Sequence, residues 1–374
     1  MRYYIIAGEA SGDLHGSNLI KELIKIDTIA TIRCWGGDLM QQAGGELVKH
    51  YKDLAFMGFV EVIRNIGKIM KNLRSCKEDI LQFNPDTLIL IDYPGFNLRI
   101  AEWAKKQGIR VIYYISPQVW AWKESRVKII KQCVDKMLVI LPFEKEFYKK
   151  WDYEVEYVGH PLLEVIDNEK KNAPAIYPTT ASPLNEKNIV ALLPGSRKQE
   201  VEMKLPLMLE TSKRFENLNF IVAKASSLDD SFYEEIMRDY PKVRSVRNKA
   251  YSLLVSAKAA LVTSGTATLE TALFEVPQVV CYKGSDISYQ IAKRLVKIRY
   301  ISLVNLILDK PVVKELIQRE LTVDNIQKEL NKILYDQETV HQMKQEYRSL
   351  WKLLSEGGHA SAKAAKSITD FLRH

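Results

Sequence analysis

The segment 262–270, Val-Thr-Ser-Gly-Thr-Ala-Thr-Leu-Glu, has the residue types and spacing of an anion site. The apolar run 259–262 predicts a buried strand, and a helix-forming stretch follows the turn Ser264-Gly265-Thr266. The first N–H groups of a helix have no partner within it, so they can bind a phosphate. Glu270 falls one turn after Thr266, where its carboxylate can accept hydrogen bonds from a ribose. The alternative is structural: Thr266 caps the helix and Glu270 complements its dipole.

A second turn of this kind follows the apolar run 189–193 and reads Pro194-Gly195-Ser196-Arg197. Arg197 at such a turn can bind a diphosphate through charge-assisted hydrogen bonds. The turn is not a P-loop, which has more residues before its Gly-Lys pair. A surface arginine is the alternative, but the position between a strand and a helix favours a phosphate.

Two acidic residues lie in the loop after the first predicted strand, where residues 8–16 read Gly-Glu-Ala-Ser-Gly-Asp-Leu-His-Gly. The glycines permit a tight turn and close approach to a ligand, but their spacing is not that of a dinucleotide motif. Glu9 and Asp13 therefore suggest binding of hydroxyl groups. The alternative is that Asp13 caps the following helix.

An aspartate follows the apolar run 87–91, in the sequence Asp92-Tyr93-Pro94-Gly95. A carboxyl group at the end of a buried strand suits general-base catalysis, because partial burial raises its pKa towards the working range. The alternative is an aspartate that only stabilises the turn before Pro94. We favour the base.

Aromatic side chains follow the next predicted strand, in the segment 116–122, Ser-Pro-Gln-Val-Trp-Ala-Trp. Trp120 and Trp122 can stack on a sugar or border an apolar pocket, but they are equally suited to an ordinary core. His160, in Gly159-His160-Pro161, can bring an imidazole to a binding cleft. A hydrogen-bonded structural histidine is the favoured alternative there.

Strand-like and helix-like runs alternate along the whole chain, which is the pattern of parallel α/β sheets. The predicted strands span 3–7, 31–35, 87–91, 110–115 and 136–140, and then 189–193, 220–223, 243–246, 259–262 and 278–282. Helices are predicted at 16–26, 61–83, 97–107, 340–354 and 360–372. Ligands of such sheets bind outside the carboxyl ends of the strands, where most of the candidate residues fall.

A polar stretch with three prolines, Asp167–Lys187, separates the two series of strands and predicts a linker. We therefore expect two doubly wound, Rossmann-like domains, at 1–166 and 188–339, that face a cleft. The terminal helices at 340–374 are predicted to pack back onto the N-terminal domain.

Composition limits the classes of function. The chain has 374 residues, 47% of them apolar, which suits two cores. The four cysteines are scattered, so neither a zinc site nor a disulfide framework is expected. The start of the chain lacks the long apolar region of a signal peptide, and no apolar run is long enough to span a bilayer. No Asp-x-Asp pair occurs, which argues against a divalent metal held on a diphosphate.

The net charge of +8 favours an acidic partner: a nucleotide or an anionic lipid, with nucleic acid the least favoured. Two stretches mix bulky apolar and basic residues. One contains Phe56, Met57 and Phe59 and continues to Arg74; the other spans 287–304. Basic amphipathic helices bind anionic membrane surfaces, although most such helices pack on a core and keep a solvated basic face.

The motifs, in their order, resemble those of the lipid-A-disaccharide synthase family. The matching segments are GEASGD at 8–13, IDYPGFN at 91–97, SPQVWAW at 116–122, GHP at 159–161, LPGSRKQE at 193–200, SGTATLE at 264–270, SLVNLI at 302–307 and KELIQ at 314–318. They span nearly the whole chain. The resemblance implies a GT-B glycosyltransferase that uses no cofactor. It also implies transfer, with inversion, of 2,3-diacylglucosamine from UDP to 2,3-diacylglucosamine 1-phosphate, which yields a β-1,6-linked disaccharide and UDP.

The resemblance also implies roles for individual residues. Asp92 corresponds to the family's general base, and Glu9 to an acidic position of its first loop. The positions implied on the UDP-sugar side, some of them in its phosphate-facing turn, are Arg197, Ser264, Gly265, Thr266, Glu270, Asn305 and Gln318. Some relatives carry a second acidic residue where this chain has Gly95. Asp92 is therefore the only carboxylate of its motif here.

Several expectations remain open beside this one. A UDP-sugar 2-epimerase on the same fold and a non-catalytic nucleotide-sugar or lipid-binding protein are the rival functions. Acylated substrates imply a cytoplasmic enzyme at the inner face of the inner membrane, with Phe56, Met57, Phe59, Trp120 and Trp122 towards lipid or acceptor. A homodimer is open, because the terminal helices can pack back within one chain or by exchange between two.

Overall fold

The computed structural model describes residues 1–54, 66–122, 124–176, 188–285, 289 and 299–373. The chain forms two compact units. The first comprises residues 1–161 together with 354–374, and the second comprises residues 162–353. The membrane-facing candidates Phe56, Met57 and Phe59 lie outside the described residues.

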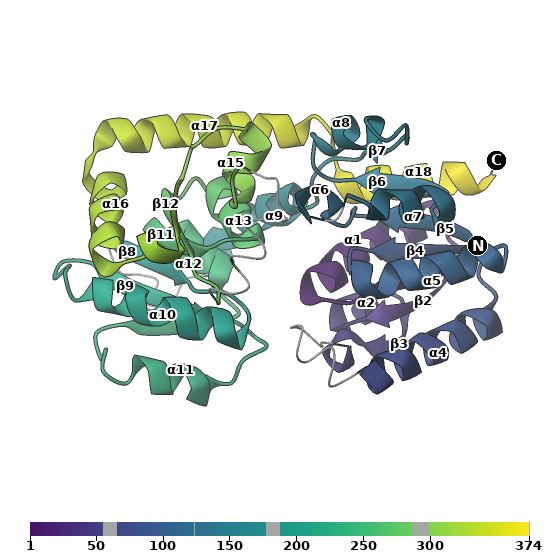
Figure 1. The fold of residues 1–374 in the computed structure, drawn as a ribbon, viewed down its shortest axis with the longest axis horizontal. Coiled ribbons are helices and arrows are strands. Elements are labelled where there is room, and N and C mark those ends of the chain that lie inside the picture. Colours follow the sequence, from purple (N-terminus) through teal and green to yellow (C-terminus); the bar gives the residue numbers. More distant parts are fainter. Residues whose placement is uncertain (55–65, 123, 177–187, 286–288, 290–298, 374) are drawn as a thin grey trace. The chain divides into compact units, whose positions relative to one another are not determined.

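The first unit is built on a seven-stranded parallel sheet with the strand order β3-β2-β1-β4-β5-β6-β7 (Figure 1). Its strands are β1 (Arg2–Ala7), β2 (Thr31–Gly36), β3 (Glu46–His50), β4 (Thr87–Ile91), β5 (Arg110–Tyr114), β6 (Lys136–Val139) and β7 (Glu156–Tyr157). Its helices are α1 (Ala10–Ile26), α2 (Asp38–Gln42), α4 (Ile66–Phe83), α5 (Pro94–Lys106), α6 (Val119–Trp122), α7 (Arg126–Cys133), α8 (Glu144–Lys149) and α18 (Ala360–Arg373), with a 3-10 turn η1 at Tyr51–Asp53.

Two cores cover the two faces of this sheet, because successive strand residues point to opposite sides. Tyr4 and Ile6 of β1 pack with α4, α5 and α7. Tyr3 and Ile5 pack on the other side, with α1 and α18. The central strands β1, β4 and β5 are buried on both faces, which explains their apolar runs.

The second unit has a six-stranded parallel sheet with the order β10-β9-β8-β11-β12-β13. Its strands are β8 (Ile189–Leu193), β9 (Asn219–Lys224), β10 (Arg244–Arg247), β11 (Ala257–Thr263), β12 (Gln278–Tyr282) and β13 (Lys314–Ile317). The helices around it are α9 (Leu162–Ile176), α10 (Lys198–Ser212), α11 (Asp230–Met237), α12 (Ala250–Ser256), α13 (Thr266–Leu273), α15 (Leu303–Leu308), α16 (Val323–Tyr335) and α17 (Gln337–Ser355), with a 3-10 turn η3 at Gln318–Glu320.

The last helix, α18, belongs to the first unit. It packs on α1, and its Ala364, Ala365 and Ile368 join the core that contains Leu19 and Ile20. Helix α17, which we expected to return with it, belongs to the second unit as far as Leu353. Its buried residues Tyr347 and Leu350 explain this placement, since the side-chain amide of Gln278 in β12 donates to the Tyr347 hydroxyl.

The boundary between the units also differs from the predicted one. Residues 167–176 of the predicted linker are helical and continue α9, whose first turns bury Leu162, Leu163 and Ile166. The prolines of this stretch suggested an irregular segment, but Pro174 lies near the end of the helix. The rest of the predicted linker, 177–187, lies outside the described residues.

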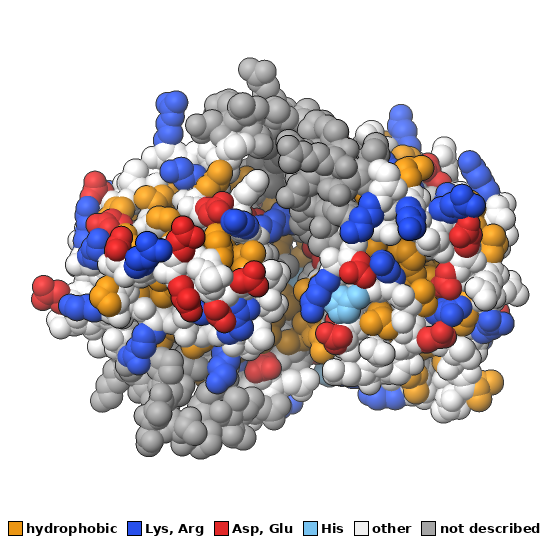
Figure 2. Space-filling view, turned by 90° about the horizontal axis from the view of Figure 1, so that it is seen from below, with side chains coloured by type: hydrophobic (Ala, Val, Ile, Leu, Met, Phe, Trp, Pro, Cys, Tyr) orange, Lys and Arg blue, Asp and Glu red, His pale blue; other side chains and the backbone are white. Residues whose placement is uncertain are grey.

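Charged side chains of both signs are interspersed on the face of the molecule seen in Figure 2. In the part of the chain that the structure describes, no helix is long and apolar enough to cross a membrane.

Candidate active site

The two predicted anion-binding turns lie next to each other in the second unit. Strands β8 and β11 are neighbours, and Leu193, the last residue of β8, pairs with Val262 near the end of β11. The turn at Gly195 and the turn at Gly265 therefore leave the same edge of the sheet from adjacent strands. Both glycines have positive φ angles, 122° and 126°, which other residues rarely adopt.

The turn at Gly265 opens helix α13 with an accessible N-terminus. Gly265 is the N-cap residue, and a β-carbon built on it would meet no atom of the described residues within 4 Å. Gly265 and Thr266 are exposed and Ser264 is half-buried. Within the described part of the chain, the start of α13 is therefore accessible to a ligand, as a phosphate site requires.

Arg197 lies on the other turn, as the N-cap residue of α10. Its guanidinium is 3.8 Å from the carboxylate of Glu200 and 56% exposed. Glu200 also packs over Gly195, where a β-carbon would come within 2.4 Å of its Oε2. The arginine is therefore held loosely beside the turn and is accessible to an anion.

Lys204 is a buried cation at this edge that sequence reasoning missed. It is 2% exposed, and its Nζ donates to Oγ1 of Thr263, the last residue of β11. Burial lowers the pKa of the Lys204 ammonium. A signal was present in the sequence: Lys204 falls three and four residues from Val201 and Met208, on the buried face of α10.

Glu270 is one turn into α13, and its Oε1 accepts a hydrogen bond of 2.9 Å from the hydroxyl of Tyr251. Burial raises the pKa of the Glu270 carboxyl group. Tyr251, on α12, was not among the predicted residues. It fixes one oxygen of the carboxylate, and the second oxygen keeps its capacity to accept hydrogen bonds from a ligand.

Asn305 and Gln318 make hydrogen bonds within the unit. Asn305 Nδ2 donates to the carbonyl of Val313 (2.8 Å) and to Glu315 Oε1 (3.0 Å), and Asn305 Oδ1 accepts from the Val313 N–H (2.9 Å). Gln318 binds the N–H and the carbonyl of Gly284 at 2.7 and 3.1 Å. These two side chains hold the loops after β12 and before β13 in place. Asn305 also lines a cavity of about 430 Å³ beside Glu315.

In the first unit, Asp92 directly follows β4 with a left-handed backbone (φ 44°). Its carbonyl accepts hydrogen bonds from Asn97 Nδ2 (2.8 Å) and from the Tyr113 hydroxyl (2.5 Å). Its N–H donates to the carbonyl of Ile115, a β-branched residue that is also left-handed (φ 67°). Left-handed conformations at such residues are strained and cluster at functional sites.

The carboxyl group of Asp92 is a weaker acid than that of an ordinary aspartate. Burial, and next the negative charge of Glu9, raise its pKa from 3.8 to about 7. The two carboxylates predicted to act in this unit are thus close enough to influence each other. A carboxylate with a pKa near 7 is well matched to proton transfer at neutral pH.

The acidic residues of the first loop have different tasks. Glu9 is the N-cap residue of α1, and its side chain makes no capping hydrogen bond. Asp13 is buried and accepts hydrogen bonds from the N–H groups of Gly37, Leu39 and Met40 at 2.8, 3.2 and 3.0 Å. Asp13 therefore caps α2, a different helix from the one that we considered.

The aromatic motif and the histidine are mostly buried. Trp120 is 8% exposed and packs edge-on against Phe143, with ring centroids 5.0 Å apart, which favours the core interpretation. The Trp122 side chain lies outside the described part. His160 is buried, and burial together with the nearby His15 lowers its pKa to about 3, so it is neutral.

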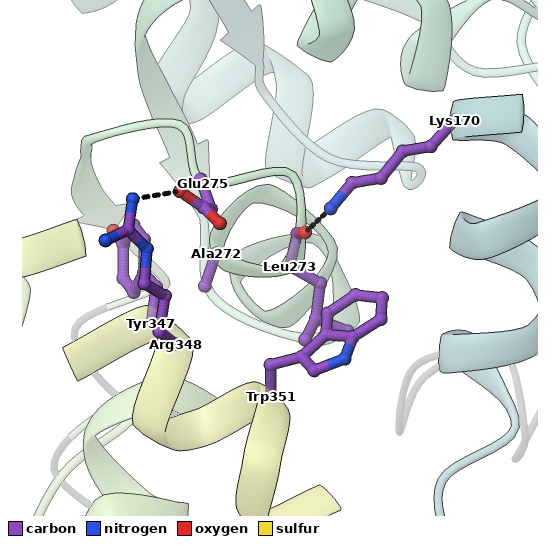
Figure 3. A pocket seen from close by; sticks show the side chains of 7 residues that line it. All are labelled: Lys170, Ala272, Leu273, Glu275, Tyr347, Arg348 and Trp351. Carbon is purple, nitrogen blue, oxygen red and sulfur yellow. Dashed lines mark hydrogen bonds and ion pairs between the residues drawn. The ribbon is translucent and has the colours of Figure 1, made fainter. Parts of the chain in front are cut away.

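A cavity of about 260 Å³ lies at the opposite, C-terminal end of α13 (Figure 3). Lys170 of α9 donates to the Leu273 carbonyl (2.9 Å), and its Nζ lies 4.6 Å from the centroid of the Trp351 ring. Arg348 pairs with Glu275 at 3.5 Å. A cation at the C-terminus of a helix interacts favourably with the helix dipole and so stabilises the helix. We therefore interpret this cavity as part of the packing that holds α13.

No group of three or more His, Cys, Asp or Glu side chains that could hold a metal occurs in the described ranges. The positively charged groups of the protein at the predicted anion site are Arg197, Lys204 and the N-terminal end of α13.

Known proteins that are similar to this chain indicate its family. Residues 3–369 match the family model described as lipid-A-disaccharide synthetase. A lipid-A-disaccharide synthase of Geobacter metallireducens is 41% identical over 340 residues, which cover 90% of this chain and 88% of the relative. One of Syntrophus aciditrophicus is 39% identical over 371 residues, covering 98% and 96%.

Solved structures show the same fold at low identity. A UDP-GlcNAc 2-epimerase from Neisseria meningitidis, bound to UDP-GlcNAc, superimposes with a TM-score of 0.68 at 12% identity over all of both chains. The glycosyltransferase of kitacinnamycin gives a TM-score of 0.64 at 12% identity, over 99% of this chain and 98% of that one. The two parallel α/β sheets are thus those of the GT-B class.

Proposed function

The chain belongs to the lipid-A-disaccharide synthase family of glycosyltransferases, and from this membership we propose that Asp92 is its general base and that the adjacent turns at Gly195 and Gly265 bind the UDP diphosphate. The reaction transfers 2,3-diacylglucosamine from UDP to 2,3-diacylglucosamine 1-phosphate. It yields the β-1,6-linked disaccharide 1-phosphate and UDP.

The chemistry requires a base on the acceptor. The acceptor's 6-hydroxyl oxygen forms a bond to the anomeric carbon of the donor, while the bond from that carbon to the diphosphate oxygen breaks. The hydroxyl proton passes to the Asp92 carboxylate. The observation that carries this assignment is the pKa of about 7 at a strand end, which leaves about half of the Asp92 carboxyl groups ionised at neutral pH and makes the carboxylate basic enough to accept a proton.

The chemistry also requires stabilisation of the leaving UDP. The N–H groups at the start of α13, the hydroxyls of Ser264 and Thr266, and the Arg197 guanidinium are suited to the diphosphate. The remaining oxygen of Glu270 is suited to the ribose hydroxyls, and Asn305 and Gln318 hold the loops of this unit. Donors fixed before the reaction cost no reorganisation when charge develops on the leaving group.

The test is Asp92→Asn, assayed for the tetra-acyl disaccharide by mass. The amide has nearly the shape of the carboxylate but accepts no proton, so we expect kcat to fall by about a hundredfold to ten-thousandfold. UDP affinity, measured by calorimetry, is expected to stay as in the unaltered protein. The matched control is Asp86→Asn, at the other end of β4, where an exposed carboxylate binds the Arg2 N–H. Wild-type turnover by Asp92→Asn would refute the assignment.

The epimerase interpretation rests on likeness of fold alone, at 12% identity. The same assay separates the two functions, because an epimerase would convert an unacylated UDP-sugar without any acceptor. The family match favours the acylated substrates.

We further propose that the protein binds the inner face of the inner membrane peripherally. The support is the net charge of +8, the acylated substrates, and the exposed face of α4, where Met70 is 58% exposed next to the exposed Lys71. Basic and apolar side chains together bind anionic bilayers. Flotation with anionic liposomes at low salt, lost at high salt, is the expected result. The absence of flotation at low salt would contradict it.

A further inference from the structure

The feature least explained by the fold is the ammonium group of Lys204. Helix α10 buries Val201, Leu205, Met208 and Leu209 on the same face, so the position belongs to a core. Yet Lys204 is only 2% exposed, and the acceptor of its hydrogen bond is a neutral hydroxyl, Oγ1 of Thr263.

Burial of this charge costs free energy, and the packing around it does not offset that cost. An ammonium loses its hydration when it is buried, and apolar residues of similar volume in place of buried charges are often neutral or stabilising. Leucine or methionine at this position would suit the core of α10 at least as well. A role in ligand binding accounts for the lysine where packing does not.

The location of the charge indicates that role. Thr263 ends β11 and directly precedes the Ser264-Gly265-Thr266 turn. The neighbouring strand β8 leads to the Gly195 turn and Arg197. Glu200 and Arg197 are close enough to act on the charge of Lys204. Lys204 therefore lies beneath the two turns.

We propose that Lys204 is a positioning residue of the diphosphate site, which acts through the hydroxyl of Thr263. A hydroxyl has one donor and two acceptor positions. Because Thr263 Oγ1 accepts from Lys204, its own hydrogen is left to donate to a phosphate oxygen at the turn. The ammonium polarises this hydroxyl and adds positive charge behind the turn. The inference deepens the proposed function and rests on it.

The test is Lys204→Met, compared with the unaltered protein for binding of UDP and of uridine. Methionine fills the space of the lysine stem without the charge. Without the ammonium that polarises the Thr263 hydroxyl and adds positive charge behind the turn, UDP binding is expected to weaken by roughly tenfold to a hundredfold. Uridine has no phosphate, so its affinity is expected to stay unchanged. A purely structural role would weaken both ligands alike.

The matched control is Lys213→Met, which removes the same charge from the far end of α10, where Lys213 is exposed and paired with Glu210 at 2.9 Å. We expect no change in either affinity. Thr263→Val, which removes the hydroxyl, is expected to weaken UDP but not uridine, and the double variant to bind UDP no more weakly than Lys204→Met alone. This second variant keeps the test decisive if Lys204→Met fails to fold.

The outcomes are distinguishable. If the unaltered protein does not bind UDP, the proposed diphosphate site is wrong. If it binds UDP and Lys204→Met binds it equally well, only the inference about Lys204 is overturned. Equal losses for UDP and uridine also overturn it, since they indicate a structural role.

Discussion

At the scale of single residues, the ionisation of Asp92 sets the pH dependence of the reaction. Its pKa is raised to about 7, and only the ionised carboxylate accepts a proton. We therefore predict that kcat/KM rises about tenfold per pH unit below pH 7 and levels off above it. A pH–rate profile between pH 5 and 9 measures this. A level profile down to pH 5 would show that the base has an ordinary carboxyl pKa.

Glu9 contributes to this raised pKa, because its negative charge disfavours ionisation of Asp92. Replacement by Glu9→Gln removes the charge and is predicted to move the acidic limb of the profile to lower pH. Glu22→Gln is the matched control on helix α1, since Glu22 pairs with Lys25 at the surface. If Glu9→Gln lowered the rate at every pH without moving the limb, Glu9 would act on the substrate and not on Asp92.

The candidate residues that the sequence predicts follow a strand directly or within a short turn. Asp92, Ser264 and Arg197 are of this kind, because an apolar run ending in a polar turn is visible in one dimension. Lys204 and Tyr251 were missed because their partners are distant in the sequence. Lys204 meets Thr263 only when α10 packs on the sheet, and Tyr251 meets Glu270 only when α12 and α13 come together. For the same reason, the structural alternative considered for Asp13 named the wrong helix. Asp13 caps α2, which begins 25 residues later in the sequence.

At the scale of elements, the carboxylate of Asp13 fixes the start of α2 through three backbone N–H groups. We predict that Asp13→Ala lowers the free energy of unfolding by about 1–3 kcal/mol, because buried donors lose their acceptor. Denaturant unfolding measures the change. Asp38→Ala, an exposed residue in the first turn of the same helix, is expected to cost only a few tenths of a kcal/mol. Similar losses in both variants would exclude the specific cap.

The central strands and the edge strand β10 were predicted within one or two residues, whereas the edge strands β3, β7 and β13 were not predicted. Strands β4, β8 and β12 match their predicted bounds, because both of their faces are buried and their residues are continuously apolar. Strand β3 is an edge strand with the sequence Glu-Leu-Val-Lys-His, and β7 has two residues. Neither carries a pattern that differs from that of a loop.

At the scale of the whole molecule, the chain leaves the first unit after Pro161 and returns to it at Leu354. The return is anchored by hydrogen bonds: the Tyr157 hydroxyl donates to the Leu354 carbonyl at 3.1 Å, and Lys363 donates to the Tyr157 carbonyl at 2.8 Å. Sequence reasoning predicted the return from the terminal helices. The sequence did not predict the residue at which the chain returns to the first unit, because residue patterns do not show which unit buries an amphipathic helix such as α17.

The return of the chain to the first unit depends on close contact between two backbone segments, at Gly159 and at Gly357. A β-carbon on Gly357 would lie 2.1 Å from the Gly159 Cα and 2.3 Å from its nitrogen, so backbone must move to admit it. We predict that Gly357→Ala lowers the free energy of unfolding of the first unit by about 1–3 kcal/mol, as overpacking does. Thermal unfolding measures the loss, and UDP affinity in the second unit is expected to stay unchanged.

The matched control is Gly67→Ala in helix α4, where a β-carbon would meet no atom of the described residues within 4 Å. Alanine is favoured over glycine inside a helix by about 0.5–1 kcal/mol, so this variant is predicted to be slightly more stable. If Gly357→Ala lowers the free energy of unfolding and Gly67→Ala raises it, the site, and not the added methyl group, decides the effect. If Gly357→Ala were as stable as the unaltered protein, the two backbones could separate without cost, and the glycine pair would not hold α18 against the first unit.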